Sequence, residues 1–147
     1  MKSTDSTVVL SLTVKDVAAA LDFYQKAFGA QELTRMPLPD GTVVQADLAI
    51  GDTFFYISPE DAAWKAHTLP EGTCAPCLFV INTEDSDAAF AKAIAAGATE
   101  INPPTTQFWG MKTAIVADPF GYRWNVRQIL EDLTHEEIMQ RAQQAMG

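Results

Sequence analysis

The polar side chains with the clearest spacing for chemistry are Arg123, Asn125 and Arg127. Successive side chains of a strand point to opposite faces, so these three share one face while Trp124 and Val126 take the other. A guanidinium group binds carboxylate and phosphate groups, or simply pairs with neighbouring acidic side chains. The alternation predicts a strand with one core face and one polar face that contacts a ligand.

Two cysteines form a Cys-Ala-Pro-Cys pair at Cys74 and Cys77. Redox couples with this spacing open a helix, whereas this pair precedes the strand-like residues 78–81. A structural zinc site needs four ligands, and one pair supplies two. We therefore interpret the cysteines as chemically inert. Of the two histidines, His67 is interpreted as a loop residue, with a lid or substrate contact as the alternative, and His135 as a surface residue.

Composition restricts the class of partner. The chain has 147 residues, 48% of them hydrophobic, and a formal net charge of −9 from 19 acidic and 10 basic residues. Nucleic-acid binding requires a positive surface, so we expect no nucleic-acid partner, while a cationic ligand stays compatible. The apolar run at 88–96 is too short to span a bilayer, and no secretory leader opens the chain. We expect no membrane association and a cytoplasmic location.

A short motif occurs twice and divides the chain. Residues 29–33 read Gly-Ala-Gln-Glu-Leu, and residues 97–101 read Gly-Ala-Thr-Glu-Ile. Each copy follows a helical pattern, at 16–28 and 85–96, with Asp16 and Asp85 as expected N-caps. The same order of elements surrounds both copies, which indicates an internal repeat.

The predicted fold is α+β, with two βαβββ modules that form a curved mixed sheet around a cleft, plus a C-terminal helix. We expect one domain over 1–147, with module one at about 7–58, a linker at 59–74, module two at about 75–128 and the last helix at about 131–146. Thr134 and Glu137 fit a capping box for that helix. The expected strands are 8–14, 31–36, 42–50, 53–58, 77–82, 99–102, 111–117 and 122–128.

Strand alternation also predicts which side chains face the cleft. On the first strand Leu10, Leu12 and Val14 face the helix, whereas Val9, Ser11 and Thr13 face away. The strand at 53–58 turns Phe54 and Tyr56 to the same open side. The loop at 107–110 is expected to bring Phe108 and Trp109 over the mouth of the cleft, with packing against a strand as the alternative for Trp109. Trp64 either joins them or packs against a dimer partner.

Specific stretches carry a family resemblance. They are Val14-Lys15-Asp16, residues 22–30, Ala95-Ala96-Gly97-Ala98, Pro103-Pro104-Thr105-Thr106-Gln107-Phe108-Trp109-Gly110 and Asp118-Pro119-Phe120-Gly121-Tyr122-Arg123-Trp124. Over about residues 7–146 the chain resembles the vicinal-oxygen-chelate superfamily of glyoxalases, bleomycin-resistance proteins and extradiol dioxygenases. Within that superfamily it resembles the PhnB-like branch most.

The resemblance implies positions for a metal site. Metal-dependent members carry His or Glu ligands on the first and last strand of each module, which here correspond to Val9, Tyr56, Leu78 and Asn125. None of these is a His, Asp, Glu or Cys, and a catalytic divalent metal needs about three good protein ligands. We therefore expect no metal ion and no cofactor.

The function that these expectations favour is metal-free binding of a small molecule, with a cationic or aromatic ligand and drug sequestration as the implied role, in a homodimer. The alternative is a lyase, isomerase or dioxygenase that uses non-standard metal ligands or acid–base work by Tyr56, Arg123 or a loop carboxylate. A third possibility is a partner-binding surface on the last helix. The expected ligand-binding residues are Val9, Ser11, Phe54, Tyr56, Leu78, Phe108, Trp109, Arg123 and Asn125.

Overall fold

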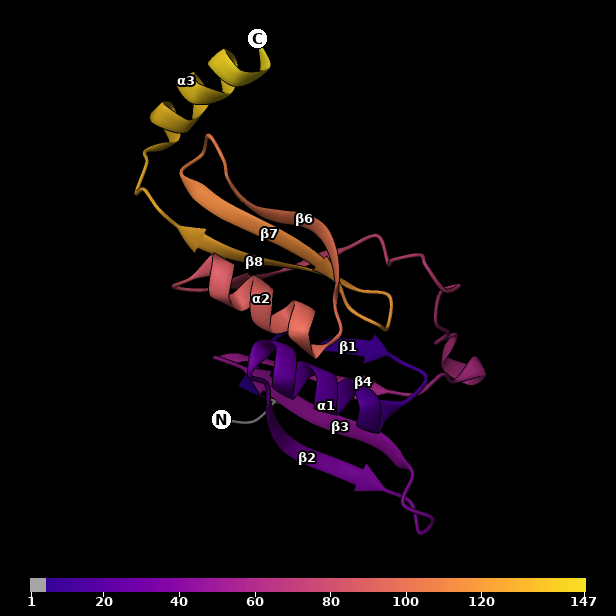
Figure 1. The fold of residues 1–147 in the computed structure, drawn as a ribbon. Coiled ribbons are helices and arrows are strands. Elements are labelled where there is room, and N and C mark those ends of the chain that lie inside the picture. Colours follow the sequence, from indigo (N-terminus) through magenta and orange to yellow (C-terminus); the bar gives the residue numbers. More distant parts are fainter. Residues whose placement is uncertain (1–4) are drawn as a thin grey trace. The chain divides into compact units, whose positions relative to one another are not determined.

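The computed structural model describes residues 5–147. They form two compact units, which divide between Thr73 and Cys74 inside the segment expected to link the two modules. Each unit holds its own four-stranded sheet with helix α1 or α2 against it (Figure 1).

Unit one contains β1 (Leu10–Thr13), α1 (Val17–Phe28), β2 (Gln31–Pro37), β3 (Val43–Ile50) and β4 (Thr53–Ser58). The strand order in the sheet is β1-β4-β3-β2. Strands β1 and β4 are parallel, and the two remaining pairs are antiparallel. A single turn of 3-10 helix, η2 (Ala62–Trp64), follows the sheet.

Unit two repeats this plan with β5 (Leu78–Asn82), α2 (Ser86–Ala96), β6 (Thr99–Thr106), β7 (Met111–Ala117) and β8 (Arg123–Ile129). Its strand order is β5-β8-β7-β6, again with one parallel pair, β5 and β8. Helix α3 (His135–Met146) ends the chain. The predicted α+β class with two βαβββ modules and a C-terminal helix is confirmed.

The core of unit one lies between α1 and the sheet. Asp16 caps the helix by accepting a hydrogen bond from the Ala19 amide at 3.0 Å, as predicted. The rings of Tyr24 and Phe55 meet edge to face, with their centroids 5.8 Å apart. Leu48 and Ile57 are fully buried on the same side of the sheet. This face is therefore closed by α1, and the alternate side chains occupy the opposite face.

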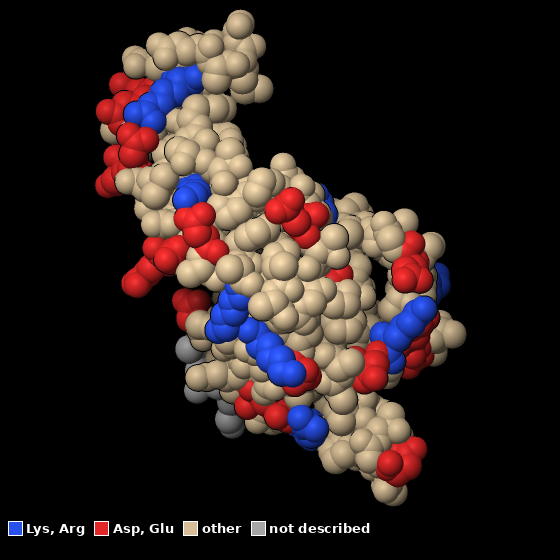
Figure 2. Space-filling view, viewed as in Figure 1, with Lys and Arg blue, Asp and Glu red and all other residues tan. Residues whose placement is uncertain are grey.

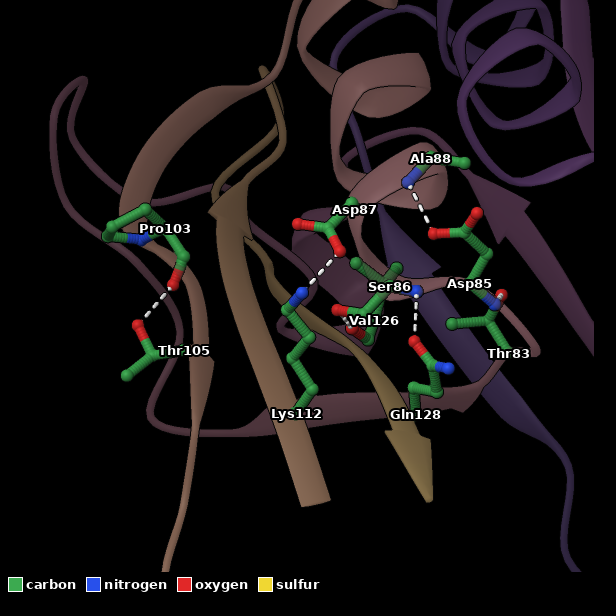
Figure 3. Close-up of polar contacts among 10 residues, drawn as sticks. All are labelled: Thr83, Asp85, Ser86, Asp87, Ala88, Pro103, Thr105, Lys112, Val126 and Gln128. Atoms are coloured by element: carbon green, nitrogen blue, oxygen red, sulfur yellow. Dashed lines mark hydrogen bonds and ion pairs between the residues drawn. The ribbon is translucent and has the colours of Figure 1, made fainter. Parts of the chain in front are cut away.

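The N-terminus of α2 is fastened to β8 by polar contacts (Figure 3). Ser86 is fully buried, and its hydroxyl donates to the Val126 carbonyl at 2.7 Å. The Ser86 amide donates to Oε1 of Gln128 at 3.1 Å, and an ion pair joins Asp87 to Lys112 on β7. These contacts hold α2 on the face of the sheet that carries Trp124 and Val126.

Three expected boundaries were wrong by two residues or more, and the others agree to within one residue. The first strand begins at Leu10 and not at residue 8, so Val9 precedes the strand on which we had expected it. Strand β6 continues to Thr106, past Pro103 and Pro104, instead of ending at residue 102. A proline cannot donate to a ladder, but β6 is an edge strand and its pairing shifts between Asn102 and Thr105, which accommodates both prolines.

Helix α3 begins at residue 135, after a Thr134 and Glu137 capping box, and not at residue 131. It extends away from the sheet of its own unit, and none of its residues is buried (Figure 1). Acidic side chains gather where it begins, with Glu136 and Glu137 in its first turn (Figure 2). Its apolar side chains form a stripe that does not cover the sheet, and they are Ile138, Met139, Ala142, Ala145 and Met146. No helix within residues 5–147 is both long and apolar enough to span a membrane.

Candidate functional site

The turn before β8 is built around the carboxylate of Asp118. One oxygen, Oδ1, accepts the backbone N–H groups of Phe120 and Tyr122 at 2.8 and 3.0 Å. The other, Oδ2, accepts the indole N–H of Trp124 at 2.9 Å. Gly121 closes the turn with a φ of 98°. The motif at 118–124 is thus a structural clamp that sets the register of β8 and the direction of the side chains that follow.

On β8 this clamp turns Arg123, Asn125 and Arg127 away from α2, as the alternation predicts. Trp124 and Val126 are buried on the α2 side, where Trp124 contacts the ring of Phe79 at a centroid distance of 4.8 Å. The term open face is used below for the side of each sheet that its own helix, α1 or α2, does not cover.

Side chains on the open face of unit two are already engaged within the sheet. Asn125 is buried, and its Oδ1 accepts the Ala114 amide at 3.2 Å. Arg123 donates to the Cys77 carbonyl at 3.2 Å, and Arg127 donates to Oδ1 of Asn82 at 2.7 Å. The arginines lie on a partly exposed surface where a further anionic partner can reach them.

The predicted residues of unit two fall into two groups. Leu78 pairs directly with Arg123, and Asn125 lies two residues further along β8. Phe108 and Trp109 lie in the β6–β7 turn, beyond the Met111 and Ile129 pair at the far end of β8. Ile129 lies six positions after Arg123 on the strand, which is roughly 20 Å. The two groups therefore lie at opposite ends of the sheet.

The β6–β7 turn is held by the segment that leads into α3. Phe108 and Trp109 pack edge to face at 4.9 Å, and Arg141 donates to the Phe108 carbonyl at 3.2 Å. Arg141 also forms a two-pronged ion pair with Glu131, at 2.7 and 3.1 Å. The hydrogen bond from Arg141, with its charge, lowers the pKa of the Glu131 carboxyl.

Gly110 is the glycine of this turn, and sequence reasoning did not single it out. Its carbonyl accepts the amides of Leu130 and Glu131, and a Cβ here would lie 3.0 Å from Cδ1 of Leu133 and 3.2 Å from the Glu131 carbonyl oxygen. Only glycine permits this close approach together with a φ of 81°. The turn and the start of the C-terminal segment form one structural element.

On the open face of unit one, Ser11 pairs directly with Tyr56, and Phe54 lies two residues before Tyr56. Phe54 is buried, whereas Tyr56 is half-buried. Asp47 is the neighbour of Tyr56 on β3, and sequence reasoning did not identify it. The signal was present, because an acidic residue stands between the apolar residues Ala46 and Leu48 in the strand.

The remaining candidates lie outside the sheets. Trp64 is 83% exposed in η2, and His67 is exposed in the segment after it. Cys74 is half-buried, Cys77 is exposed, and both are free thiols. The side chains of Trp64 and His67 are therefore both exposed to solvent.

Register makes the two modules comparable residue by residue. Gln31 pairs with Ala49, and Thr99 pairs with Ala117, the repeat offset of 68 residues being the same on both strands. Following the ladders from there, Tyr56 corresponds to Asn125. The same ladders relate Val9, one residue before the first β1–β4 pair, to Leu78, which is in the first β5–β8 pair. The four positions inferred for metal ligands are thus two pairs of equivalent positions.

The donors at these four positions do not fit a catalytic divalent metal. Val9 and Leu78 offer no electron pair, and the amide oxygen of Asn125 already accepts the Ala114 N–H. Tyr56 would have to lose its proton to become a strong ligand. Within residues 5–147, no three His, Cys, Asp or Glu side chains gather in an arrangement that could hold an ion.

Comparison with known proteins agrees with the two-module architecture. Residues 6–126 match the model of the Glyoxalase/Bleomycin resistance protein/Dioxygenase superfamily. An uncharacterized protein of Mycobacterium bovis, Mb0911c, is 37% identical over 139 residues, which cover 92% of this chain and 91% of the relative.

Two solved structures are similar in fold and sequence. TioX from Micromonospora sp. ML1 is 27% identical, with a TM-score of 0.69 over 85% of this chain and 99% of its own. The At5g48480 gene product of Arabidopsis thaliana is 27% identical, with a TM-score of 0.67 over 82% and 97% of the two chains. The chain belongs to the glyoxalase/bleomycin resistance protein/dioxygenase superfamily.

Proposed function

We propose that this protein is a PhnB-like member of the superfamily that binds a small molecule on the open faces of its sheets and uses no catalytic metal. The observation that carries the proposal is the lack of suitable metal ligands at the four positions implied by the family. In particular, the amide oxygen of Asn125 already accepts the Ala114 N–H. On the open face of unit one, Tyr56 and Ser11 offer an aromatic ring and hydroxyl groups, and on the open face of unit two Arg123 offers a guanidinium group. Such groups bind polar aromatic compounds without catalysing a reaction.

The nature of the ligand follows from charge and ring content. The net charge is −9, and the open face of unit one combines Tyr56 with the carboxylate of Asp47. A cationic or aromatic ligand fits that combination, and sequestration of such a compound in the cytoplasm is the role we propose.

Metal analysis tests the metal-free part of the proposal. The purified protein is dialysed after incubation with zinc, nickel, manganese or ferrous iron, and the bound metal is measured per chain. We expect substoichiometric metal in every case. An ion that survives dialysis at one per chain would favour instead the alternative of a lyase, isomerase or dioxygenase with non-standard ligands.

Ligand binding is tested separately by thermal shift with panels of cationic, neutral and anionic aromatic compounds. We expect stabilisation by members of at least one panel, because a ligand that binds only the folded state raises its melting temperature. A complete absence of stabilisation across all panels would contradict the binding role even if no metal were found.

We further propose that the protein is a homodimer in which α3 contacts the second copy. The support is the uncovered apolar stripe of α3, where Met139 is 47% and Met146 is 80% exposed. Ile138→Glu should raise the dimer dissociation constant in sedimentation equilibrium, whereas Gln140→Glu, on the other side of the helix, should leave it unchanged. A monomeric native protein would refute the proposal.

A further inference from the structure

One row of side chains crosses the open face of unit one from edge to edge. Ser11 on β1 pairs with Tyr56 on β4, Tyr56 pairs with Asp47 on β3, and Asp47 pairs with Thr34 on β2. Neighbouring strands lie about 4.8 Å apart, so these four side chains are contiguous.

The orientation of this row follows from its neighbours. Ala46 and Leu48, on either side of Asp47, are both fully buried, and so is Ile57 next to Tyr56. The contact between Tyr24 and Phe55 shows that this buried side is the α1 side. Because alternate residues of a strand face opposite ways, Asp47 and Tyr56 point away from α1.

Among residues 5–147, the structure pairs the Asp47 carboxylate with no cationic side chain. The hydrogen bond that it accepts comes from the neutral amide of Gln45, at 3.2 Å, on the same face. Among residues 5–73 the ion pairs of the structure are those of Lys26 with Asp22 and of Arg35 with Glu32, and neither includes Asp47. Asp47 is half-buried, so solvent screens its charge only in part.

The residues beside Asp47 suit an organic cation. The ring of Tyr56 lies on the adjacent strand, and aromatic faces attract ammonium groups through their quadrupole. The hydroxyls of Ser11 and Thr34 flank the pair and can accept N–H groups. A carboxylate next to an aromatic ring is the arrangement that neutralises and covers an ammonium group at the same time.

We propose that Asp47 and Tyr56 bind the ammonium group of the ligand, so that the ligand class is an aromatic compound with a positively charged nitrogen. This inference rests on the proposed function and adds the residues that recognise the charge. The equivalent row of unit two contains Val80, Asn125 and Ile115, so it lacks both the carboxylate and the ring. The two open faces therefore differ in the ligand group that they accept.

The test is an NMR titration of the 15N-labelled full chain with benzyltrimethylammonium chloride, a cation that has no proton to lose. We expect chemical-shift changes concentrated at residues 45–49 and 54–58, and weaker binding at high salt. Asp47→Asn should weaken binding about tenfold, which is the usual scale of one partly desolvated charge contact. Tyr56→Leu should weaken it similarly, while Tyr56→Phe, the matched control, keeps the ring and should bind within about threefold.

Further measurements separate the possible failures. The uncharged isostere, neopentylbenzene, should cause much smaller shifts at the same residues. If Asp47→Asn does not fold, Asp47→Ser and the salt dependence of the native protein supply the same comparison. Equal binding by the native protein and the Asp47 variants, or shifts confined to residues 123–127, would overturn this inference while leaving metal-free binding intact. Stoichiometric metal would overturn the proposed metal-free function, but it would leave intact the assignment of the organic cation to Asp47 and Tyr56.

Discussion

Replacing Asp118 with alanine is the most informative perturbation of the fold that positions the site. The variant loses two hydrogen bonds from backbone amides and one from the indole of Trp124, which is 5% exposed. Water can reach the partly exposed amides again, but the buried indole N–H is left without a partner. Hydrogen bonds to charged groups contribute about 1.5–3 kcal/mol each, and an unsatisfied buried donor costs about 1–3 kcal/mol.

These contributions are not additive, and we expect the free energy of unfolding of unit two to fall by about 3 kcal/mol. Because the chain has two compact units, native-state hydrogen exchange of the β8 amides is the assay that reports unit two directly. The matched control is Asp52→Ala, in the corresponding turn of unit one, where Asp52 accepts a hydrogen bond from the Thr53 hydroxyl at 3.4 Å on an exposed surface. That variant should change stability by less than about 0.5 kcal/mol.

A double-mutant cycle identifies the indole contribution. Trp124→Phe removes the indole N–H, so Asp118→Ala should cost about 1–2 kcal/mol less in that background than in the native protein. A loss below about 1 kcal/mol for Asp118→Ala alone, or strict additivity in the cycle, would refute the clamp as the origin of the β8 register.

Three further predictions concern the supports of unit two. Ser86→Ala should lower the stability of unit two by about 1–2 kcal/mol, measured by urea denaturation, because the buried hydrogen bond to the Val126 carbonyl is lost. Gly110→Ala should speed hydrogen exchange at residues 130–137 by about tenfold, because the added methyl group meets the Glu131 backbone at a positive φ. The pKa of Glu131 is lowered from 4.5 by Arg141, so this contact stabilises the structure above that pH and is lost as the pH falls through the lower, folded-state value. The protection factors of the α3 amides, which correct for the slower intrinsic exchange in acid, should therefore fall on acidification in the native protein and not in Glu131→Gln.

Much of the fold was predictable because several of its elements are determined by residues that are close in the sequence. The helix caps at Asp16 and Asp85 and the capping box at Thr134 all depend on neighbours in the sequence, and all occur in the structure. The errors have a different origin. The continuation of β6 through two prolines depends on its being an edge strand, which is a property of the whole sheet.

The site was less predictable than the fold. Alternation correctly separates Trp124 from Arg123 and Phe55 from Tyr56. Alternation gives no information about the order and register of the strands. The pairing of Asp47 with Tyr56 is therefore found only once the register is known. The place of the Phe108–Trp109 turn, at the far end of the sheet from Arg123, likewise depends on the ladder between β7 and β8.

The two modules have diverged on one side of their sheets and not on the other. At equivalent helix-facing positions, Phe55 and Trp124 are both large and buried, and Ile57 and Val126 are both aliphatic and buried. Packing against a helix tolerates only changes that conserve volume and apolar character. The open faces have no such restriction from their own helix.

On the open faces, the side chains at equivalent positions of the two modules differ in chemical type. Tyr56 corresponds to Asn125, and its neighbour Asp47 corresponds to Ile115. Unit one thus presents a carboxylate beside a ring, and unit two presents Arg123 and Arg127 on either side of an engaged amide. The differences in charge between the two modules therefore lie on the open faces and not in the core. On such a face a repeated fold can acquire ligand recognition at little cost in stability. A chimera that carries Asp47→Ile and Tyr56→Asn should therefore fold with nearly native stability and lose cation binding; a collapse of unit one would show that its open face is part of the core.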